Sequence, residues 1–141
     1  MPVQISRYII EDELGRGGFG TVYLAYDTEL DRKVAIKLFR ESDAAVLSPE
    51  RELHALAKLD HPGIVPVYDT GMYNGCAYFV SKYIPGPTLS ECMRKRKFSS
   101  SAAAELVAQV CDAVAHAHSR GVILRDIKPS NIILEDGTRP I

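Results

Sequence analysis

The chain has 141 residues, 46% hydrophobic side chains and a formal net charge of −1, which suit one globular domain or part of one and exclude a longer multi-lobed domain. This charge balance gives no sign of a positively charged surface that would bind nucleic acid or an anionic membrane, so neither is expected as a partner. No apolar run approaches the roughly 18–20 residues of a membrane span and no signal-peptide pattern opens the chain, so we expect a cytoplasmic protein without a membrane segment.

Residues 8–83 carry mostly short β-strand patterns. Strands are expected at "YIIEDELG", "TVYLAYD" and "KVAIKLF", with a glycine loop after the first and a polar turn at Thr28–Arg32 after the second. "SPERELHALAKLD" predicts a helix with Ser48 as its N-cap and Pro49 at its first position. "IVPVYDTG" and "CAYFVSKYI" predict two further strands, joined by the hairpin dipeptide Asn74-Gly75. The expected result is a five-stranded antiparallel sheet with one helix.

The pattern becomes helical after Pro85-Gly86-Pro87, which is expected to form a hinge or linker. Thr88–Glu91 is a capping-box sequence, and Ser99–Ser101 precede a second, longer helix that Gly121 is well placed to close. A β-rich half followed by an α-rich half indicates an α+β protein. The long helix is expected to bury one apolar stripe, made of Leu106, Val107, Val110, Cys111, Val114 and Ala117.

The segment Gly15–Gly20 reads G-x-G-x-x-G, a pattern that lets backbone N–H groups approach phosphate oxygens closely. By itself the pattern is weak, because dinucleotide-binding folds and many plain turns share it. In a dinucleotide-binding fold the loop opens a helix, whereas here it runs into the strand pattern Thr21–Ala25. The order of elements therefore disfavours a dinucleotide site.

Two further motifs carry chemistry. In Val34-Ala35-Ile36-Lys37, Ala35 and Lys37 share one strand face, so the small residue leaves room for a flat ring while the lysine reaches anionic oxygen. A buried strand that ends in a solvated lysine is the alternative. The loop Asp126–Asn131 offers a carboxylate, an ammonium and an amide, which suit proton acceptance, phosphate neutralisation and cation binding. An ordinary polar loop with a proline is the alternative there.

Taken together in this order, the glycine loop, V-A-I-K, a helix glutamate and R-D-x-K-P-x-N resemble the amino-terminal half of a eukaryotic-like (Hanks-type) serine/threonine protein kinase domain. The D-I-K-P-S-N form is similar to the serine/threonine branch. The resemblance implies a protein-kinase-like fold, with a small ATP-binding lobe at residues 1–84 and part of the large lobe, with its first helices and catalytic loop, at residues 85–141. It also implies transfer of the ATP γ-phosphate to Ser/Thr hydroxyls of a protein substrate, with ATP and Mg²⁺ as cofactors.

The same resemblance assigns the nucleotide site. The glycine loop would cover the phosphates, and Lys37 would bind them while pairing with Glu52, which the nine-residue spacing to His61 favours over Glu50. Ser81 would be an unusually small gatekeeper behind the adenine. The cofactor-binding residues implied are Leu14, Gly15, Gly17, Gly18, Gly20, Val22, Ala35, Lys37, Ser81, Lys82, Ile84, Asn131 and Ile133.

In the catalytic loop, the resemblance makes Asp126 the acceptor of the substrate hydroxyl proton, Lys128 a γ-phosphate contact and Asn131 a Mg²⁺ ligand. Leu124 stands where the family has a histidine, and it can fill the same apolar stack. The catalytic residues implied are Lys37, Glu52, Asp126 and Lys128.

The family's D-F-G motif does not occur in the 141 residues, so the resemblance covers nearly all of the chain but only about half of the family's domain. We therefore expect the chain to be inactive by itself, as a fragment or as a split form that a second chain completes. Two alternatives remain open. One is a catalytically dead nucleotide-binding or partner-binding pseudokinase, and the other is a structural fragment without nucleotide affinity.

Overall fold

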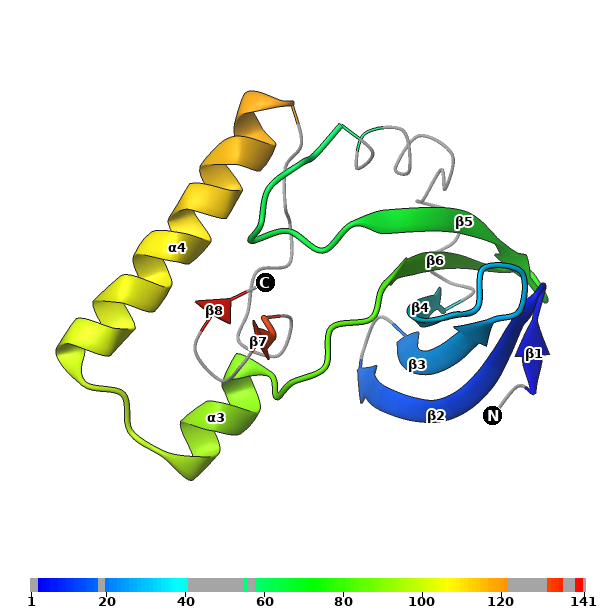
Figure 1. The fold of residues 1–141 in the computed structure, drawn as a ribbon, viewed down its shortest axis with the longest axis horizontal. Helices are drawn as coiled ribbons and strands as arrows, with labels where there is room; N and C mark the ends of the chain where they lie inside the picture. The colour runs from blue at the N-terminus through cyan, green and yellow to red at the C-terminus, as the bar shows by residue number, and fades with distance from the viewer. Residues whose placement is uncertain are drawn as a thin grey trace. The chain divides into compact units, whose positions relative to one another are not determined.

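The computed structural model describes residues 3–17, 20–40, 55, 58–121, 132–135 and 139–140. The chain divides into two compact units (Figure 1). Unit 1 comprises Met1–Ala57 and Pro66–Tyr83, and unit 2 comprises Lys58–Val65 and Ile84–Ile141. The short stretch Lys58–Val65 therefore belongs to unit 2, although its neighbours in the sequence on both sides belong to unit 1.

Unit 1 contains a curled antiparallel sheet in the order β1-β2-β3-β4-β6-β5 (Figure 1). The five strands predicted from the sequence are present, and β1 is an additional strand of two residues that the sequence did not predict. A tight turn at Ser6, with a φ of 52°, folds β1 back onto β2. The strands are β1 Gln4–Ile5, β2 Tyr8–Gly17, β3 Gly20–Asp27, β4 Arg32–Phe39, β5 Val67–Tyr73 and β6 Cys76–Lys82.

The turn between β5 and β6 follows the prediction. Asn74 and Gly75 have φ values of 48° and 81°, the left-handed conformation that a two-residue hairpin of type I′ requires. The start of β5 differs, because residues 64–66 were predicted to lie in the strand. Ile64 instead donates its N–H to the carbonyl oxygen of His61 at 3.0 Å and closes a turn, so β5 begins at Val67.

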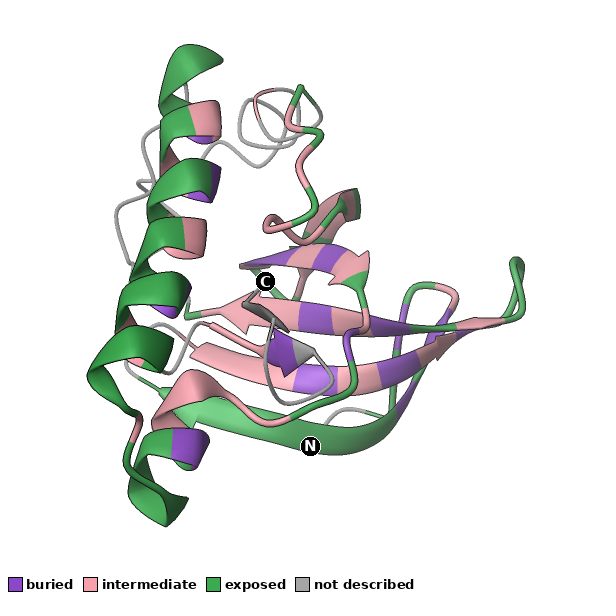
Figure 2. Cartoon of the chain, turned by 60° about the vertical axis from the view of Figure 1, so that its left-hand side comes forward, coloured by how far each residue is buried: buried purple, intermediate pink, exposed green. Residues whose placement is uncertain are grey.

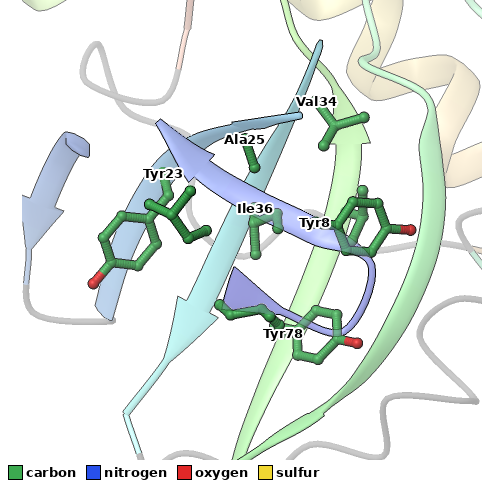
Figure 3. Packing of buried hydrophobic residues seen from close by; sticks show 9 residues of the cluster. Tyr8, Tyr23, Ala25, Val34, Ile36 and Tyr78 are labelled. Atoms are coloured by element: carbon green, nitrogen blue, oxygen red, sulfur yellow. The ribbon is translucent and has the colours of Figure 1, made fainter. Parts of the chain in front are cut away.

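The core of unit 1 lies on one face of the sheet and is built by strand alternation (Figure 3). In β4, Val34 and Ile36 are fully buried, whereas Ala35 and Lys37 point to the opposite face and are half-buried. Tyrosine rings fill much of the space between the strands. The buried cluster consists of Ile5, Tyr8, Ile10, Tyr23, Ala25, Val34, Ile36, Tyr78 and Val80.

A buried carboxylate ties the amino-terminal segment to the sheet. Asp27 is fully buried, lies 3.1 Å from Nε of Arg7, and accepts the backbone N–H groups of Glu29 at 3.0 Å and Leu30 at 3.2 Å. Burial by itself opposes ionisation, but these N–H groups and the Arg7 guanidinium hold the pKa of Asp27 below its ordinary value. The ionised carboxylate therefore stabilises the joint between β3 and the start of β2.

Unit 2 contains α3 Leu89–Lys95, α4 Ser100–Ser119 and the short strands β7 Leu134–Glu135 and β8 Arg139–Pro140. Both predicted helix starts are confirmed, because Thr88 Oγ1 accepts the N–H of Glu91 and Ser99 Oγ accepts the N–H of Ala102, each at 3.1 Å. Gly121, with a φ of 78°, follows the last turn of α4 as predicted. Among the described helices, none combines the length and apolar character needed to cross a bilayer.

The apolar stripe predicted for α4 is only partly correct. Leu106 and Ala117 are buried, but Val107 is 62% exposed and Cys111 is exposed, while the small Ala113 is buried instead (Figure 2). Fewer of the apolar side chains of α4 are thus buried than their spacing in the sequence predicts. In the described residues, the core of unit 2 is small and consists of Cys92, Leu106 and Leu134, packed against Leu89, Phe98 and Ile132.

The stretch Lys58–Val65 is attached to α4 through two histidines. His61 Nε2 lies 3.1 Å from a carboxylate oxygen of Asp112, and His61 Nδ1 accepts the N–H of Gly63 at 2.8 Å. His116 Nε2 accepts the N–H of Asp60 at 3.2 Å. These contacts give both histidines a structural role within unit 2.

Candidate functional site

Two rows of side chains run across the strands on the face of unit 1 opposite its core. We call this surface the outer face. Residues that pair directly across antiparallel strands project from the same face, so the strand register decides which side chains meet. Since Val34 and Ile36 point into the core, their neighbours Ala35 and Lys37 belong to the outer face. The first row is Gly15, Val22, Lys37 and Phe79, and the second is Leu24, Ala35 and Ser81.

The glycine loop joins β2 to β3, and its described residues include Gly15, Gly17 and Gly20. Gly20 has a φ of 147°, and a Cβ built on it would overlap the carbonyl oxygen of Leu38. Only glycine therefore fits between the loop and β4 at this position. Arg40 Nη2 also donates to the carbonyl oxygen of Gly17 at 3.3 Å, which links the loop to the end of β4.

Leu14 lies at a β-bulge. The register shifts between Glu13 and Gly15, so Leu14 has no direct partner on β3, and it is 45% exposed. A bulge changes the direction in which the side chain of its extra residue points. Leu14 therefore does not follow the alternation of side chains between the two faces of the sheet just before the glycine loop. The neighbouring Arg16 forms a 2.7 Å ion pair with Glu13, and this hydrogen bond raises the pKa of the Arg16 guanidinium above its ordinary value.

Lys37 lies half-buried in the first row, directly across from Phe79 and one position before Leu38. Its ammonium Nζ is 5.2 Å from the centre of the Phe39 ring, within the range of a cation–π contact. Phe39 and Phe79 pack edge to face with centroids 5.3 Å apart. Neither phenylalanine was predicted to be a site residue, although strand alternation from Lys37 indicates that Phe39 shares its face.

Ala35 and Ser81 pair directly between β4 and β6, and both are small and half-buried. The side chains of the second row are therefore short at the position that the resemblance assigns to the adenine. Lys82 ends β6 and donates its N–H to the carbonyl oxygen of Pro66 at 3.0 Å. Ile84 is 5% exposed and belongs to unit 2.

The remaining candidate residues fall elsewhere. Ile133 is in unit 2, where it pairs with Thr88 as an isolated β-bridge, next to the buried Leu134. Among the described residues, no group of three or more His, Cys, Asp or Glu side chains could hold a metal ion. Outside the described residues lie Gly18, Glu50, Glu52, Leu124, Asp126, Lys128 and Asn131.

The described geometry fits a phosphate-bearing ligand with a flat ring. A cation at Lys37 lies in the same row as Gly15, where backbone N–H groups can approach an anion closely, and the adjacent row offers the small side chains of Ala35 and Ser81. The outer face thus brings together five of the predicted site residues from four strands.

Comparison with known proteins points in the same direction. A family model described as "Protein kinase domain" matches residues 8–140. The serine/threonine-protein kinase PknD of Protochlamydia amoebophila is 34% identical over 153 residues, covering 95% of this chain and 15% of that protein. The serine/threonine-protein kinase PrkC of Bacillus subtilis is 38% identical over 135 residues, covering 92% of this chain and 21% of that protein.

Solved structures show the same similarity. The Mycobacterium tuberculosis PknI kinase domain superposes with a TM-score of 0.80 at 28% identity, covering 98% of this chain and 59% of that one. The apo form of PpkA-294 gives a TM-score of 0.84 at 26% identity, with coverage of 100% and 59%. The chain thus spans 15–21% of these curated relatives and less than two thirds of the solved domains.

Proposed function

Because this chain belongs to the protein kinase domain family, we propose that it provides the ATP-binding lobe and catalytic loop of an enzyme that transfers the γ-phosphate of ATP to Ser/Thr hydroxyls of protein substrates. The observation that carries the proposal is the strand register. It aligns Gly15, Val22 and Lys37 in one row, and Ala35 with Ser81 in the next. A site that binds phosphates next to adenine needs a cation in one row and small side chains in the adjacent row.

In this proposal, the glycine loop and Lys37 bind the ATP phosphates, while Leu14, Val22 and Ala35 enclose the adenine from two sides. Ser81 borders the adenine, and the backbone of Lys82 and Ile84 contacts its polar edge. Glu52 pairs with Lys37. These roles rest on the family and on the outer face, where β4 presents the small Ala35 and, two residues later, the cationic Lys37.

The chemical step is assigned to residues 85–141, taken as part of the large lobe, with residues 1–84 as the small lobe. Asp126 accepts the hydroxyl proton of the substrate and Lys128 steadies the γ-phosphate. The family resemblance also assigns Asn131 and Ile133 to nucleotide binding. Asn131 would hold Mg²⁺ in part, and the ion would neutralise negative charge at the phosphates. Cytoplasmic location and completion by a second chain remain part of the proposal.

A non-catalytic pseudokinase is the second candidate, and Leu124 favours it because the family has a histidine at that position. Lys37, Asp126, Lys128 and Asn131 are all present, which favours the enzyme. A pseudokinase would bind nucleotide or a partner protein and transfer no phosphate. Binding and transfer must therefore be measured separately.

The test uses a chimera in which the part of Bacillus subtilis PrkC that follows the matched region is fused after residue 141. Phosphorylation of a Ser/Thr peptide is expected, and Asp126→Asn should lower its rate by about 10²-fold or more while leaving ATP affinity unchanged. Lys37→Met is the matched control, which should weaken ATP binding itself. The 141-residue chain alone is expected to show no transfer. ATP binding without transfer in the unmodified chimera would favour the pseudokinase.

A further inference from the structure

We propose that Phe39, braced by Phe79, is a positioning residue that holds the ammonium of Lys37 toward the nucleotide phosphates. The inference rests on the proposed function, because it gives Lys37 its phosphate-binding role. It adds an aromatic support that none of the site assignments above includes. The structural basis is a three-residue cluster on the outer face of unit 1, made of Lys37, Phe39 and Phe79.

The strand register brings the three side chains together. Lys37 and Phe39 are two residues apart in β4, so both project from the outer face. Phe79 in β6 pairs directly with Lys37, and an aromatic ring at that position can also reach the diagonal neighbour Phe39. The strand register therefore places the three side chains next to one another on the same face of the sheet.

The Lys37 ammonium contacts the Phe39 ring, and Phe79 packs against that ring. Lys37 Nζ is 5.2 Å from the Phe39 centroid, which lies within the roughly 6 Å limit for a cation–π contact. The Phe39 and Phe79 rings are inclined by 77° with centroids 5.3 Å apart, an edge-to-face arrangement that fixes the orientation of Phe39. All three side chains are half-buried, so water screens the contact only in part.

The position of Phe39 also relates the lysine to the glycine loop. Phe39 pairs directly with Gly20 across β3 and β4, and the next residue, Arg40, donates to the carbonyl oxygen of Gly17. The ring that contacts the ammonium thus lies beside the backbone that would surround the phosphates. A lysine side chain loses considerable rotamer freedom when it is fixed, and a preformed contact reduces that loss on binding.

An aromatic ring suits this task because it attracts the cation without neutralising it. The contact with the ring itself uses none of the ammonium's N–H donors, which serve carboxylate and phosphate oxygens. A leucine at position 39 would keep most of the apolar packing but would lose the ring quadrupole. A tyrosine would keep both. These two substitutions separate a positioning role from a packing role.

The experiment measures the affinity of the 141-residue chain for ATP and for adenosine, which lacks phosphates. Phe39→Leu should weaken ATP binding by about three- to tenfold and leave adenosine binding unchanged. Phe39→Tyr should bind both like the unmodified chain. In a Lys37→Met background, Phe39→Leu should cause no further loss of ATP affinity. Equal losses for ATP and adenosine, or an undiminished ATP affinity in Phe39→Leu, would overturn the positioning role.

A second readout does not need nucleotide. Protons on the Lys37 ε-carbon should show an upfield ring-current shift that is clearly reduced in Phe39→Leu, where only the Phe79 ring remains, and that persists in Phe39→Tyr. If the chain bound no ATP, the proposed function would fail, and this shift would still decide whether Phe39 holds the ammonium. An unchanged Lys37 shift in Phe39→Leu would overturn the inference even if ATP binds.

Discussion

The two units of this chain differ in how they bury their apolar side chains. In unit 1, nine buried residues from five strands form one continuous cluster on a single face of the sheet. In the described part of unit 2, the corresponding cluster has three buried residues, and α4 exposes Val107 along a helix of twenty residues. Unit 1 is therefore supported by its own core, whereas unit 2 has little core within the described residues.

This difference bears on how each unit can hold a functional site. The outer face of unit 1 is the reverse side of a packed sheet, so the positions of Ala35 and Lys37 are set by the burial of Val34 and Ile36, which alternate with them along β4. The chain spans 59% of the PknI and PpkA-294 structures that it resembles. We propose that the exposed side of α4 packs against further large-lobe elements in a complete kinase domain.

The largest expected effect contrasts the two units directly. Ile36→Ala should lower the free energy of unfolding by about 2–4 kcal/mol, because it leaves a cavity in a core that cannot collapse easily. Val107→Ala is the matched control and should change that free energy by less than about 0.5 kcal/mol, since its side chain is already in water. Urea unfolding followed by circular dichroism measures both. Comparable losses would contradict the contrast between the units.

A second prediction sharpens the description of the outer face. Because Ala35 and Ser81 are both small, ATP analogues with a bulky group on the exocyclic amine should bind about as well as ATP. Ser81→Met should weaken binding of the bulky analogue by about tenfold or more and leave ATP affinity nearly unchanged, since a core packed on the other face keeps the sheet in place. Equal exclusion of the analogue before and after the substitution would refute the gatekeeper assignment.

A third prediction addresses the proposed pairing of Glu52 with Lys37; Glu52 lies outside the described residues. Glu52→Ala should weaken ATP binding by about two- to fivefold, the usual scale of an ion pair, and Glu50→Ala should have a smaller effect. Equilibrium ATP titrations of the two variants provide the comparison. The reverse order would move the helix register by two residues and would remove Glu52 from the site.

A further prediction concerns the pH dependence of stability in unit 1. The pKa of Asp27 is held below its ordinary value, so its stabilising contribution is present at neutral pH and is lost as pH falls through the folded-state pKa. At pH 7, Asp27→Asn should lower Tm by about 4–8 °C, and the difference from the unmodified chain should shrink below about pH 4. The exposed Asp12→Asn is the control. A difference that grows in acid would contradict the sign of this shift.

Much of the sheet could be predicted from the sequence, because its signals are local. Period-two alternation located five strands, and Asn74-Gly75 specified the hairpin turn. The helix starts at Thr88 and Ser99 were also local, since each cap acts within three residues. Strand β1 could not be predicted in this way, because two residues carry no periodicity and their pairing depends on the turn at Ser6.

The burial of α4 and the aromatic support of Lys37 needed tertiary information. Hydrophobic spacing marks a stripe on a helix but not how much of it is covered, so Val107 was expected inside and lies in water. Strand alternation places Phe39 beside Lys37, but only the register between β4 and β6 brings Phe79 against both. The assignments of Glu52, Asp126, Lys128 and Asn131 stay predictions from family resemblance.

The most direct test of the central claim is to follow methyl NMR signals of unit 1 during an ATP titration. Val22 and Ala35 lie on the outer face, whereas Ala25 and Val34 pair with each other on the core face of the same two strands. If the outer face binds ATP, the Val22 and Ala35 methyls should shift strongly and saturably, while those of Ala25 and Val34 should move little. The shifts should disappear at the same ATP concentrations in Lys37→Met. Equal shifts on both faces, or none at Val22 and Ala35 while ATP binds, would contradict the account.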